Sequence, residues 1–207
     1  KLDHTAFEKE IEERGIEYLI HFTPTINLMG IFELGKLLSR ALLEKCDIDQ
    51  TDIRDYVEFT DDIRFDDKNY INLSIQHPNS FWCVLKTDKK YIYHQDTLFS
   101  VTNAANGYNK RNVGVTGDID KFRMMFTPSL TVVTSYNSKI ISRGTLKSQY
   151  PTDEQAEVLV KNEIPVSDIL QVCFKDDNDL AAGKAALSGY NTDNFVVDAS
   201  LFINSRI

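Results

Sequence analysis

The chain has 207 residues, of which 42% are hydrophobic, 11% aromatic and 26% charged, a composition typical of a globular protein and unlike that of a disordered one. Its formal net charge of −8 argues against a protein that coats nucleic acid through a broad basic surface, but it leaves a local basic groove open. No apolar run approaches the ~20 residues of a membrane span and no signal-peptide pattern opens the chain, so we expect one domain over residues 1–207 in the cytoplasm, without membrane contact.

The N-terminal part of the chain predicts a helix, a strand and a second helix. Residues 4–14 carry Phe7 and Ile11 at helical spacing and end before Gly15. Residues 18–23 are rich in β-prone side chains and predict a strand. The next helix is expected over residues 24–34, ending at Gly35, with Thr23 as its N-cap, Pro24 at its first position, and a core-facing side made of Ile26, Met29, Ile31 and Leu34.

His21 and Thr23 therefore lie where this strand ends and faces the start of a helix. Such a place suits an anionic or amide-bearing ligand, because the first backbone N–H groups of a helix have no partner within it. The alternative is that His21 is a structural residue that is satisfied by its neighbours.

The middle of the chain predicts a mixture of strands and loops. A helix is expected at 41–45, then a long loop with Arg54 and Arg64, and long loops in compact domains are often binding elements. The clean alternation of residues 70–75 predicts a strand, with further strand material at 82–85 and 90–93. The remaining expectations are a loop at 103–117, a helix at 118–126 capped by Asp118, and a mobile loop over 131–147 that leads to Glu157.

Glu157 precedes the apolar run Val158–Val160, which predicts a short buried strand with a carboxylate at its mouth. An acidic group there is costly unless it is paired or used. The alternative is a solvated carboxylate on an edge strand. A turn at 165–168, a strand at 169–174, a helix at 178–188 and a strand at 195–197 complete an α+β fold with a mixed, mostly antiparallel sheet.

Several kinds of site are not indicated. The three cysteines, Cys46, Cys83 and Cys173, are far apart in apolar surroundings, which predicts buried free thiols rather than disulfides or a zinc site. The sequence lacks Walker, Rossmann and zincin motifs, and we expect no metal.

The residues around these elements resemble a known family. The matching segments are His21-Phe-Thr23, Asn27-Leu28, Gly30 with Gly35-Lys-Leu-Leu38, Ile63-Arg64, Asn69 to Asn79, Thr102 to Ala105, Tyr150 to Val160, and Ile164-Pro165. In this order, over about residues 16–175, they resemble DarT, toxins that transfer ADP-ribose from NAD onto bases of single-stranded DNA. The resemblance implies an ADP-ribosyltransferase-like fold and NAD as the co-substrate.

The resemblance also implies roles for single residues in binding NAD. His21 and Thr23 would hold the nicotinamide amide or its ribose, and Asn27 would support the same pocket. Ser74 would line that pocket. Arg64, rather than Arg54, would reach the NAD pyrophosphate or the reacting base, because it lies closer to the matched strand.

Glu157 would be the catalytic residue, together with Arg64. Cleavage of the bond to nicotinamide leaves an oxocarbenium-like sugar, which one fixed carboxylate stabilises, and the same carboxylate can take the proton from the attacking base nitrogen. The loop at about 139–156 would present the DNA strand, with Arg143, Lys147 and Tyr150 as its contacts.

The acceptor is less closely defined by the sequence. The strand at Asn72-Leu-Ser-Ile with Pro78-Asn79 favours the guanine-modifying branch of the family over the thymine-modifying one. Gln155 and Glu157 match the Gln-x-Glu spacing of protein-modifying relatives, so a protein, RNA or small-molecule acceptor stays open, as does a catalytically inactive nucleic-acid-binding module. The expected partner is a macrodomain antitoxin of the DarG type; the sequence indicates no oligomeric state.

Overall fold

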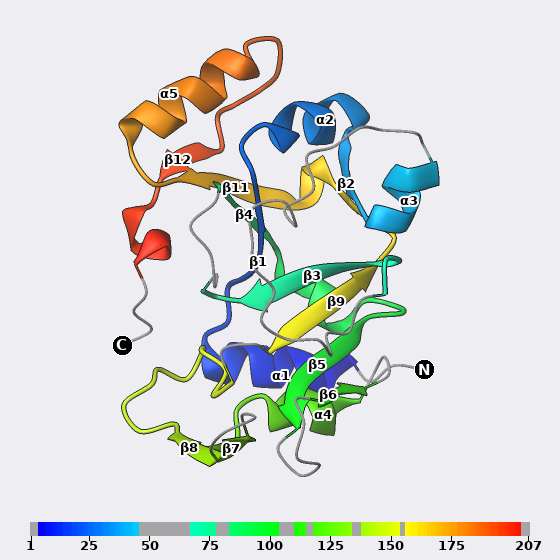
Figure 1. The fold of residues 1–207 in the computed structure, drawn as a ribbon, viewed down its shortest axis with the longest axis vertical. Coiled ribbons are helices and arrows are strands. Elements are labelled where there is room, and N and C mark those ends of the chain that lie inside the picture. The colour runs from blue at the N-terminus through cyan, green and yellow to red at the C-terminus, as the bar shows by residue number, and fades with distance from the viewer. Residues whose placement is uncertain are drawn as a thin grey trace.

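The computed structural model describes residues 4–45, 67–77, 83–103, 110–114, 118–133, 138–153 and 156–203. Its centre is an eight-stranded sheet in the order β12-β11-β4-β1-β3-β9-β5-β6 (Figure 1). The paired strands of this sheet run antiparallel, apart from β11 and β12, which run parallel. This confirms the mixed, mostly antiparallel sheet. The strands are β1 (Tyr18–Thr23), β3 (Tyr70–Ile75), β4 (Cys83–Asp88), β5 (Leu98–Asn103), β6 (Lys110–Gly114), β9 (Glu157–Lys161), β11 (Ile169–Phe174) and β12 (Phe195–Val197).

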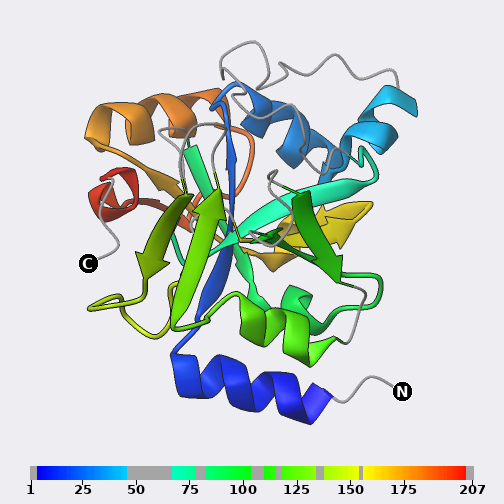
Figure 2. The ribbon, with the colours of Figure 1, turned by 60° about the horizontal axis from the view of Figure 1, so that its bottom comes forward.

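Helices and two small sheets surround the central sheet. The helices are α1 (His4–Arg14), α2 (Asn27–Leu34), α3 (Arg40–Lys45), α4 (Ile119–Met124) and α5 (Asp177–Ala186), with 3-10 helices at Lys89–Tyr93, Val166–Asp168 and Ala199–Phe202. The small sheets pair β2 (Lys36–Leu38) with β10 (Glu163–Pro165), and β7 (Ser129–Val133) with β8 (Ser138–Ser142). Figure 2 shows α1 and α4 side by side at one end of the sheet, near the β7–β8 hairpin. In the described part of the chain, no helix is both long and apolar enough to cross a bilayer.

The core lies between one face of the sheet and the helices. Phe7 of α1, Phe99 of β5 and Phe122 of α4 are at most 1% exposed, and their ring centroids are 5.6 to 6.0 Å apart. Burial of each ring contributes about 1.5–3 kcal/mol before the entropy cost of ordering the chain. Alternate residues of β3, namely Ile71, Leu73 and Ile75, face this core, so the residues between them face the other side of the sheet.

The strands β1 and β3 separate near the middle of the sheet. They pair only at Leu19↔Ile75 and Ile20↔Ser74, whereas β1 pairs with β4 over its whole length. At the closed end, Gln76 has φ +62° and its side-chain oxygen accepts hydrogen bonds from the backbone N–H groups of Glu17 and Tyr18. Beyond Ile20 the two strands diverge, which places the C-terminal end of β1 and the first half of β3 at an opening in the sheet.

Many of the sequence-based predictions are confirmed. The predicted helix at 4–14 is α1, and the strands predicted at 18–23, 70–75, 169–174 and 195–197 have the expected bounds. The short helix capped by Asp118 is α4, whose cap accepts a hydrogen bond from the backbone N–H of Lys121. Cys83 and Cys173 are buried free thiols, and burial raises the pKa of Cys173 to about 11; Cys46 lies outside the described residues.

The predicted start of the second helix is wrong. Pro24, Thr25 and Ile26 form a turn, with the N–H of Asn27 bonded to the carbonyl of Pro24, and the helix begins at Asn27 with no side-chain cap. The helix starts three residues later than predicted, and its buried residues are Leu28, Ile31 and Phe32. Ile26 and Met29, which were predicted to face the core, are instead 70% and 43% exposed. The stop at Gly35 is confirmed, since this residue has φ +68° and caps the helix.

Three predictions for the middle of the chain are also wrong. Residues 90–93 are not a strand but part of the 3-10 helix Lys89–Tyr93, because Asp88 accepts the N–H of Lys90 and starts a turn that buries Tyr91 and Ile92. The predicted loop at 103–117 contains β6, which pairs with β5, and the predicted loop at 131–147 contains most of the β7–β8 hairpin. In both hairpins the cross-strand partner, which local sequence does not show, decides the structure.

Candidate active site

Glu157 lies on the face of the sheet opposite the helical core, in a row of polar side chains. It is the first residue of β9 and pairs directly with Ser74 of β3 on one side and Ser100 of β5 on the other. Directly opposed residues of antiparallel strands point to the same face, so the carboxylate lies between two serines. The next row along, Leu73, Val158 and Phe99, points into the core. The strand β9 is therefore central, and the alternative of an edge strand is wrong.

Asn72 connects Glu157 to the opening between β1 and β3. Its side-chain Nδ2 donates a hydrogen bond to Oε2 of Glu157 at 3.1 Å, and its backbone carbonyl accepts one from Nδ1 of His21, also at 3.1 Å. Glu157 is partly buried and Asn72 is exposed. One residue thus ties the histidine of β1 to the carboxylate of β9. Asn72 was not predicted to belong to the site; the available signal was its position two residues before Ser74, on the same face of the strand predicted at 70–75.

The hydrogen bond from His21 defines the state of its ring. A carbonyl oxygen only accepts, so Nδ1 carries the proton. Desolvation lowers the pKa of His21, and the hydrogen bond to Asn72 opposes this only partly. The ring is therefore neutral near pH 7, and its Nε2 presents a lone pair that can accept a hydrogen bond from a hydroxyl or an amide N–H.

Thr23 and Asn27 form the turn that follows His21. Thr23 is buried, and its hydroxyl oxygen accepts a hydrogen bond from Nδ2 of Asn27 at 3.0 Å. This contact joins the end of β1 to the first residue of α2, in place of the predicted cap of a backbone N–H. His21, Thr23 and Asn27 are thus brought together at one end of the opening, while Ser74 and Glu157 lie in the polar row on β3 and β9.

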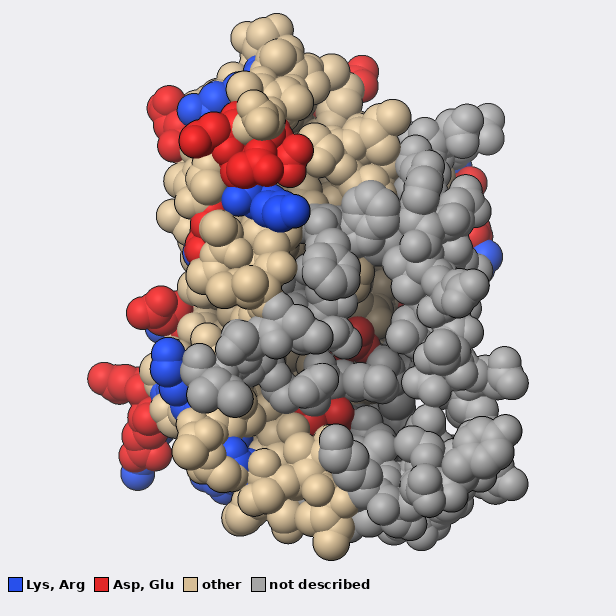
Figure 3. All heavy atoms as spheres, turned by 60° about the vertical axis from the view of Figure 1, so that its left-hand side comes forward, with Lys and Arg blue, Asp and Glu red and all other residues tan. Residues whose placement is uncertain are grey.

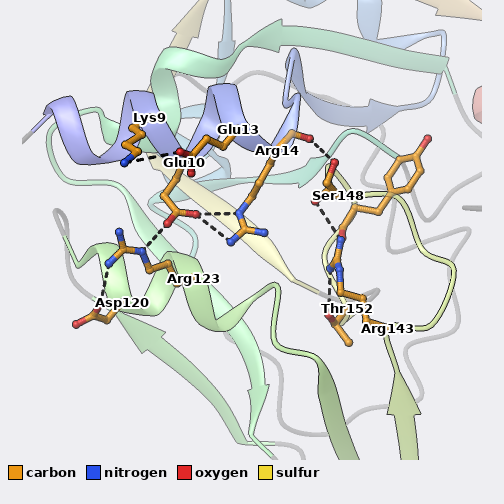
Figure 4. Close-up of polar contacts among 10 residues, drawn as sticks. Lys9, Glu10, Glu13, Arg14, Asp120, Arg123, Arg143, Ser148 and Thr152 are labelled. Atoms are coloured by element: carbon orange, nitrogen blue, oxygen red, sulfur yellow. Dashed lines mark hydrogen bonds and ion pairs between the residues drawn. The ribbon is translucent and has the colours of Figure 1, made fainter.

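The segment between β8 and β9 is held by Arg143. Its guanidinium donates hydrogen bonds to the carbonyls of Tyr150, Lys147 and Ser148 at 2.9, 2.7 and 3.1 Å, and to the hydroxyl of Thr152 at 3.2 Å. Figure 4 shows this segment beside the end of α1, where the hydroxyl of Ser148 donates to the carbonyl of Arg14. Four guanidinium N–H groups of Arg143 therefore stabilise the loop itself.

Lys147 and Tyr150 lie on the same loop with different surroundings. Lys147 is exposed, whereas Tyr150 is partly buried and packs edge-on against His77, with ring centroids 6.1 Å apart. His77 follows the end of β3, so the ring of Tyr150 connects the loop to the strand that carries Asn72 and Ser74.

One face of the molecule shows no broad basic surface among the described residues (Figure 3). On the face drawn in Figure 3, basic atoms are scattered between acidic ones, and acidic atoms gather at the end of the molecule that carries α5. Lys86 does not add to a basic surface, because it is 7% exposed and pairs with Asp198 at 2.9 Å.

Three residues named in the sequence-based predictions, Arg64, its alternative Arg54 and Gln155, lie outside the described residues. In the described ranges, no group of three or more His, Cys, Asp and Glu side chains is placed to hold a metal ion.

The described geometry supports one kind of chemistry. A carboxylate that is oriented by an amide donor and set between two hydroxyls can stabilise positive charge on a sugar carbon and can accept a proton. The neutral imidazole of His21 offers a hydrogen-bond acceptor to a ligand that carries such a sugar. Glycoside hydrolysis usually needs a second carboxylate opposite the first. In the described strands the cross-strand neighbours of Glu157 are instead two serines, Ser74 and Ser100.

Comparison with known protein families identifies the family of this chain. A sequence model of the family described as "ssDNA thymidine ADP-ribosyltransferase, DarT" matches residues 20–202. No curated protein sequence matches the chain.

Similar solved structures share the fold. "Thermosipho africanus DarTG in complex with ADP-ribose" has 16% identity and a TM-score of 0.55, covering 90% of this chain, which spans only 51% of that one. "Thermus sp. 2.9 DarT in complex with NAD+" has 11% identity and a TM-score of 0.54, covering 90% of this chain and 98% of the other. "Thermus sp. 2.9 DarT in complex with ADP-ribosylated ssDNA" has 10% identity and a TM-score of 0.55, covering 91% and 97%.

Proposed function

Because the chain belongs to the DarT family of single-stranded DNA ADP-ribosyltransferases, we propose that it moves ADP-ribose from NAD onto a base of single-stranded DNA with Glu157 as the catalytic carboxylate. The observation that carries this proposal is the link through Asn72, which holds Glu157 and His21 at the same opening of the sheet. This link supports the proposal because it provides two separate groups, a carboxylate and an imidazole, for two parts of one dinucleotide.

The roles follow from the chemistry of the groups. Nε2 of His21 accepts a hydrogen bond from a ribose hydroxyl or from the nicotinamide amide, and the turn at Thr23 and Asn27 supports the same end of NAD. Ser74, beside Glu157, lines the ribose site. In the reaction the bond from the ribose carbon to nicotinamide breaks, nicotinamide leaves with the bonding electrons, and a nitrogen of the base forms the new bond. Glu157 stabilises the sugar cation and takes the proton that the base nitrogen loses.

The acceptor strand is proposed to bind along the loop before β9. In this proposal the exposed Lys147 contacts a phosphate and the ring of Tyr150 stacks on a base. Arg143 contributes by shaping the loop, through the four hydrogen bonds described above. Arg64 is proposed to reach the NAD pyrophosphate or the reacting base, as its match to the family pattern implies.

The modified base is proposed to be guanine rather than thymine. The strand Asn72-Leu-Ser-Ile with Pro78-Asn79 resembles the guanine-modifying branch, whereas the description of the matching family names thymidine. Four oligonucleotides that each contain a single reactive base, in an otherwise uniform strand, distinguish these outcomes by the mass gain of one ADP-ribose.

We also propose a partner protein and a cellular location for the enzyme. A toxin that marks DNA needs a partner that removes the mark, and we propose a macrodomain antitoxin of the DarG type. The similar Thermosipho chain, of which this chain spans half, is named DarTG. We place the enzyme in the cytoplasm, where its DNA acceptor would be met.

One experiment tests the activity. The purified chain is incubated with NAD and single-stranded DNA, RNA or protein, and products are identified by mass. We expect labelled DNA, and no label after Glu157→Gln, which keeps the shape of the side chain and removes its charge. Glu163→Gln is the matched control, because Glu163 forms an exposed ion pair with Lys36 on β2, and it should leave the rate unchanged. Labelled RNA or protein instead of DNA, or full activity of Glu157→Gln, would refute the proposal.

A further inference from the structure

Ser100 of β5 has a buried hydroxyl without a hydrogen-bond partner among the described residues. Its side chain is fully buried and its Oγ contacts no donor or acceptor there. Buried polar groups nearly always have a partner, and one that has none makes the folded state less stable. A strand position with this property therefore calls for a reason other than packing.

The register of β5 directs this hydroxyl to the active site. Ser100 pairs with Glu157, while its neighbour Phe99 pairs with Val158 in the helical core. Side chains alternate between the faces of a sheet, so Ser100 shares a face with Glu157 and not with Phe99. Directly opposed side chains have Cβ atoms about 4.5–5.5 Å apart, which is within reach of a hydrogen bond between a serine and a glutamate.

The other side of Glu157 already has a donor in Asn72, which binds Oε2. A carboxylate has two oxygens and accepts several hydrogen bonds, so a second donor from β5 would fix its plane. A hydrogen bond from a hydroxyl to a carboxylate also favours the ionised form, which is the form that the proposed reaction uses.

We propose that Ser100 is a positioning residue, whose hydroxyl donates a hydrogen bond to the carboxylate of Glu157 when NAD binds. Among the described residues this hydroxyl has no other partner, so it is available to the carboxylate of Glu157. This inference rests on the proposed function of Glu157 and adds a second strand, β5, to the machinery that orients it.

The test compares two serines that each have a buried hydroxyl without a hydrogen-bond partner among the described residues. Ser39 is also buried with an unpartnered hydroxyl among the described residues, but its backbone N–H binds the carbonyl of Asn162, at the far end of β9 from Glu157. Ser39→Ala and Ser100→Ala should both leave the thermal midpoint unchanged or raise it, because each removes an unsatisfied polar group. Ser100→Thr keeps the hydroxyl.

The readout is the pH profile of kcat with NAD and oligonucleotide, beside KM for NAD. For Ser100→Ala we expect kcat on the acidic limb to fall about 10-fold and the limb to move up by about one pH unit, with KM changed less than twofold. Ser39→Ala should match the wild type, and Ser100→Thr should restore the limb. An unmoved limb in Ser100→Ala, or a loss that appears only in KM, overturns the positioning role while the wild-type activity stands. An inactive wild type instead refutes the proposed function, and the inference with it.

Discussion

The link from Asn72 to Glu157 can be tested by changing one atom. Asn72→Asp replaces the donating amide by a carboxylate oxygen, 3.1 Å from Oε2 of Glu157. Two like charges at that distance repel by about 1.3 kcal/mol even at a water-like dielectric constant of about 80, and by about 5 kcal/mol at a value of about 20. Because Asn72 is exposed, the lower figure applies, and 1.4 kcal/mol corresponds to about one pH unit. We expect the acidic limb of the kcat profile to move up by at least about one unit.

The substitution is selective because the two contacts of Asn72 use different groups. His21 binds the backbone carbonyl, which the change does not touch, so KM for NAD should rise less than kcat falls. Asn191→Asp is the control: Asn191 is exposed and its side-chain oxygen accepts the N–H of Asp193, which an aspartate also accepts. Steady-state rates between pH 5 and 9 measure the limb. A profile of Asn72→Asp that coincides with the wild type would refute the placement of Glu157 in the reaction.

Two further predictions concern stability. Desolvation lowers the pKa of His21 in the folded chain, so below the unfolded-state histidine pKa of about 6.5 the unfolded chain binds more protons than the folded one. The free energy of unfolding should therefore fall as pH drops through that value. Thermal midpoints measured from pH 7.5 to 5 should decline less in His21→Asn than in the wild type, and an equal decline would contradict this cause. Gly183→Ala would place a Cβ 2.5 Å from the ring of Phe174, so we expect a loss of about 1–3 kcal/mol in urea unfolding despite the higher helix propensity of alanine. The control, Gly189→Ala, meets no atom within 4 Å and should change stability by less than about 0.5 kcal/mol.

The sequence predicted those parts of the fold in which the local pattern and the tertiary contacts agree. The alternation of residues 70–75 and the apolar run after Glu157 gave β3 and β9, since both strands bury one face against the helices. The strand β6 was missed because its Asn- and Gly-rich surroundings indicate a loop, and only pairing with β5 makes it a strand.

The candidate site was predicted in part for the same reason. His21 and Glu157 were identified through local motifs, and the structure places both beside Asn72. Ser100 lies in none of the matched segments, Asn72 was used only for the strand pattern, and the relation of both to Glu157 exists only in the register of three strands. Pairing register depends on contacts between residues more than fifty positions apart, which periodicity in a single sequence does not reveal.

The position of Glu157 within a central strand has a consequence for how the enzyme moves. Its backbone belongs to β9, which is hydrogen-bonded to β3 on one side and to β5 on the other, so shifting it would require two ladders to open together. Amide hydrogens of β9 should therefore exchange with solvent among the slowest in the chain. Any rearrangement during turnover then falls to side chains that move around a carboxylate whose main chain stays in place.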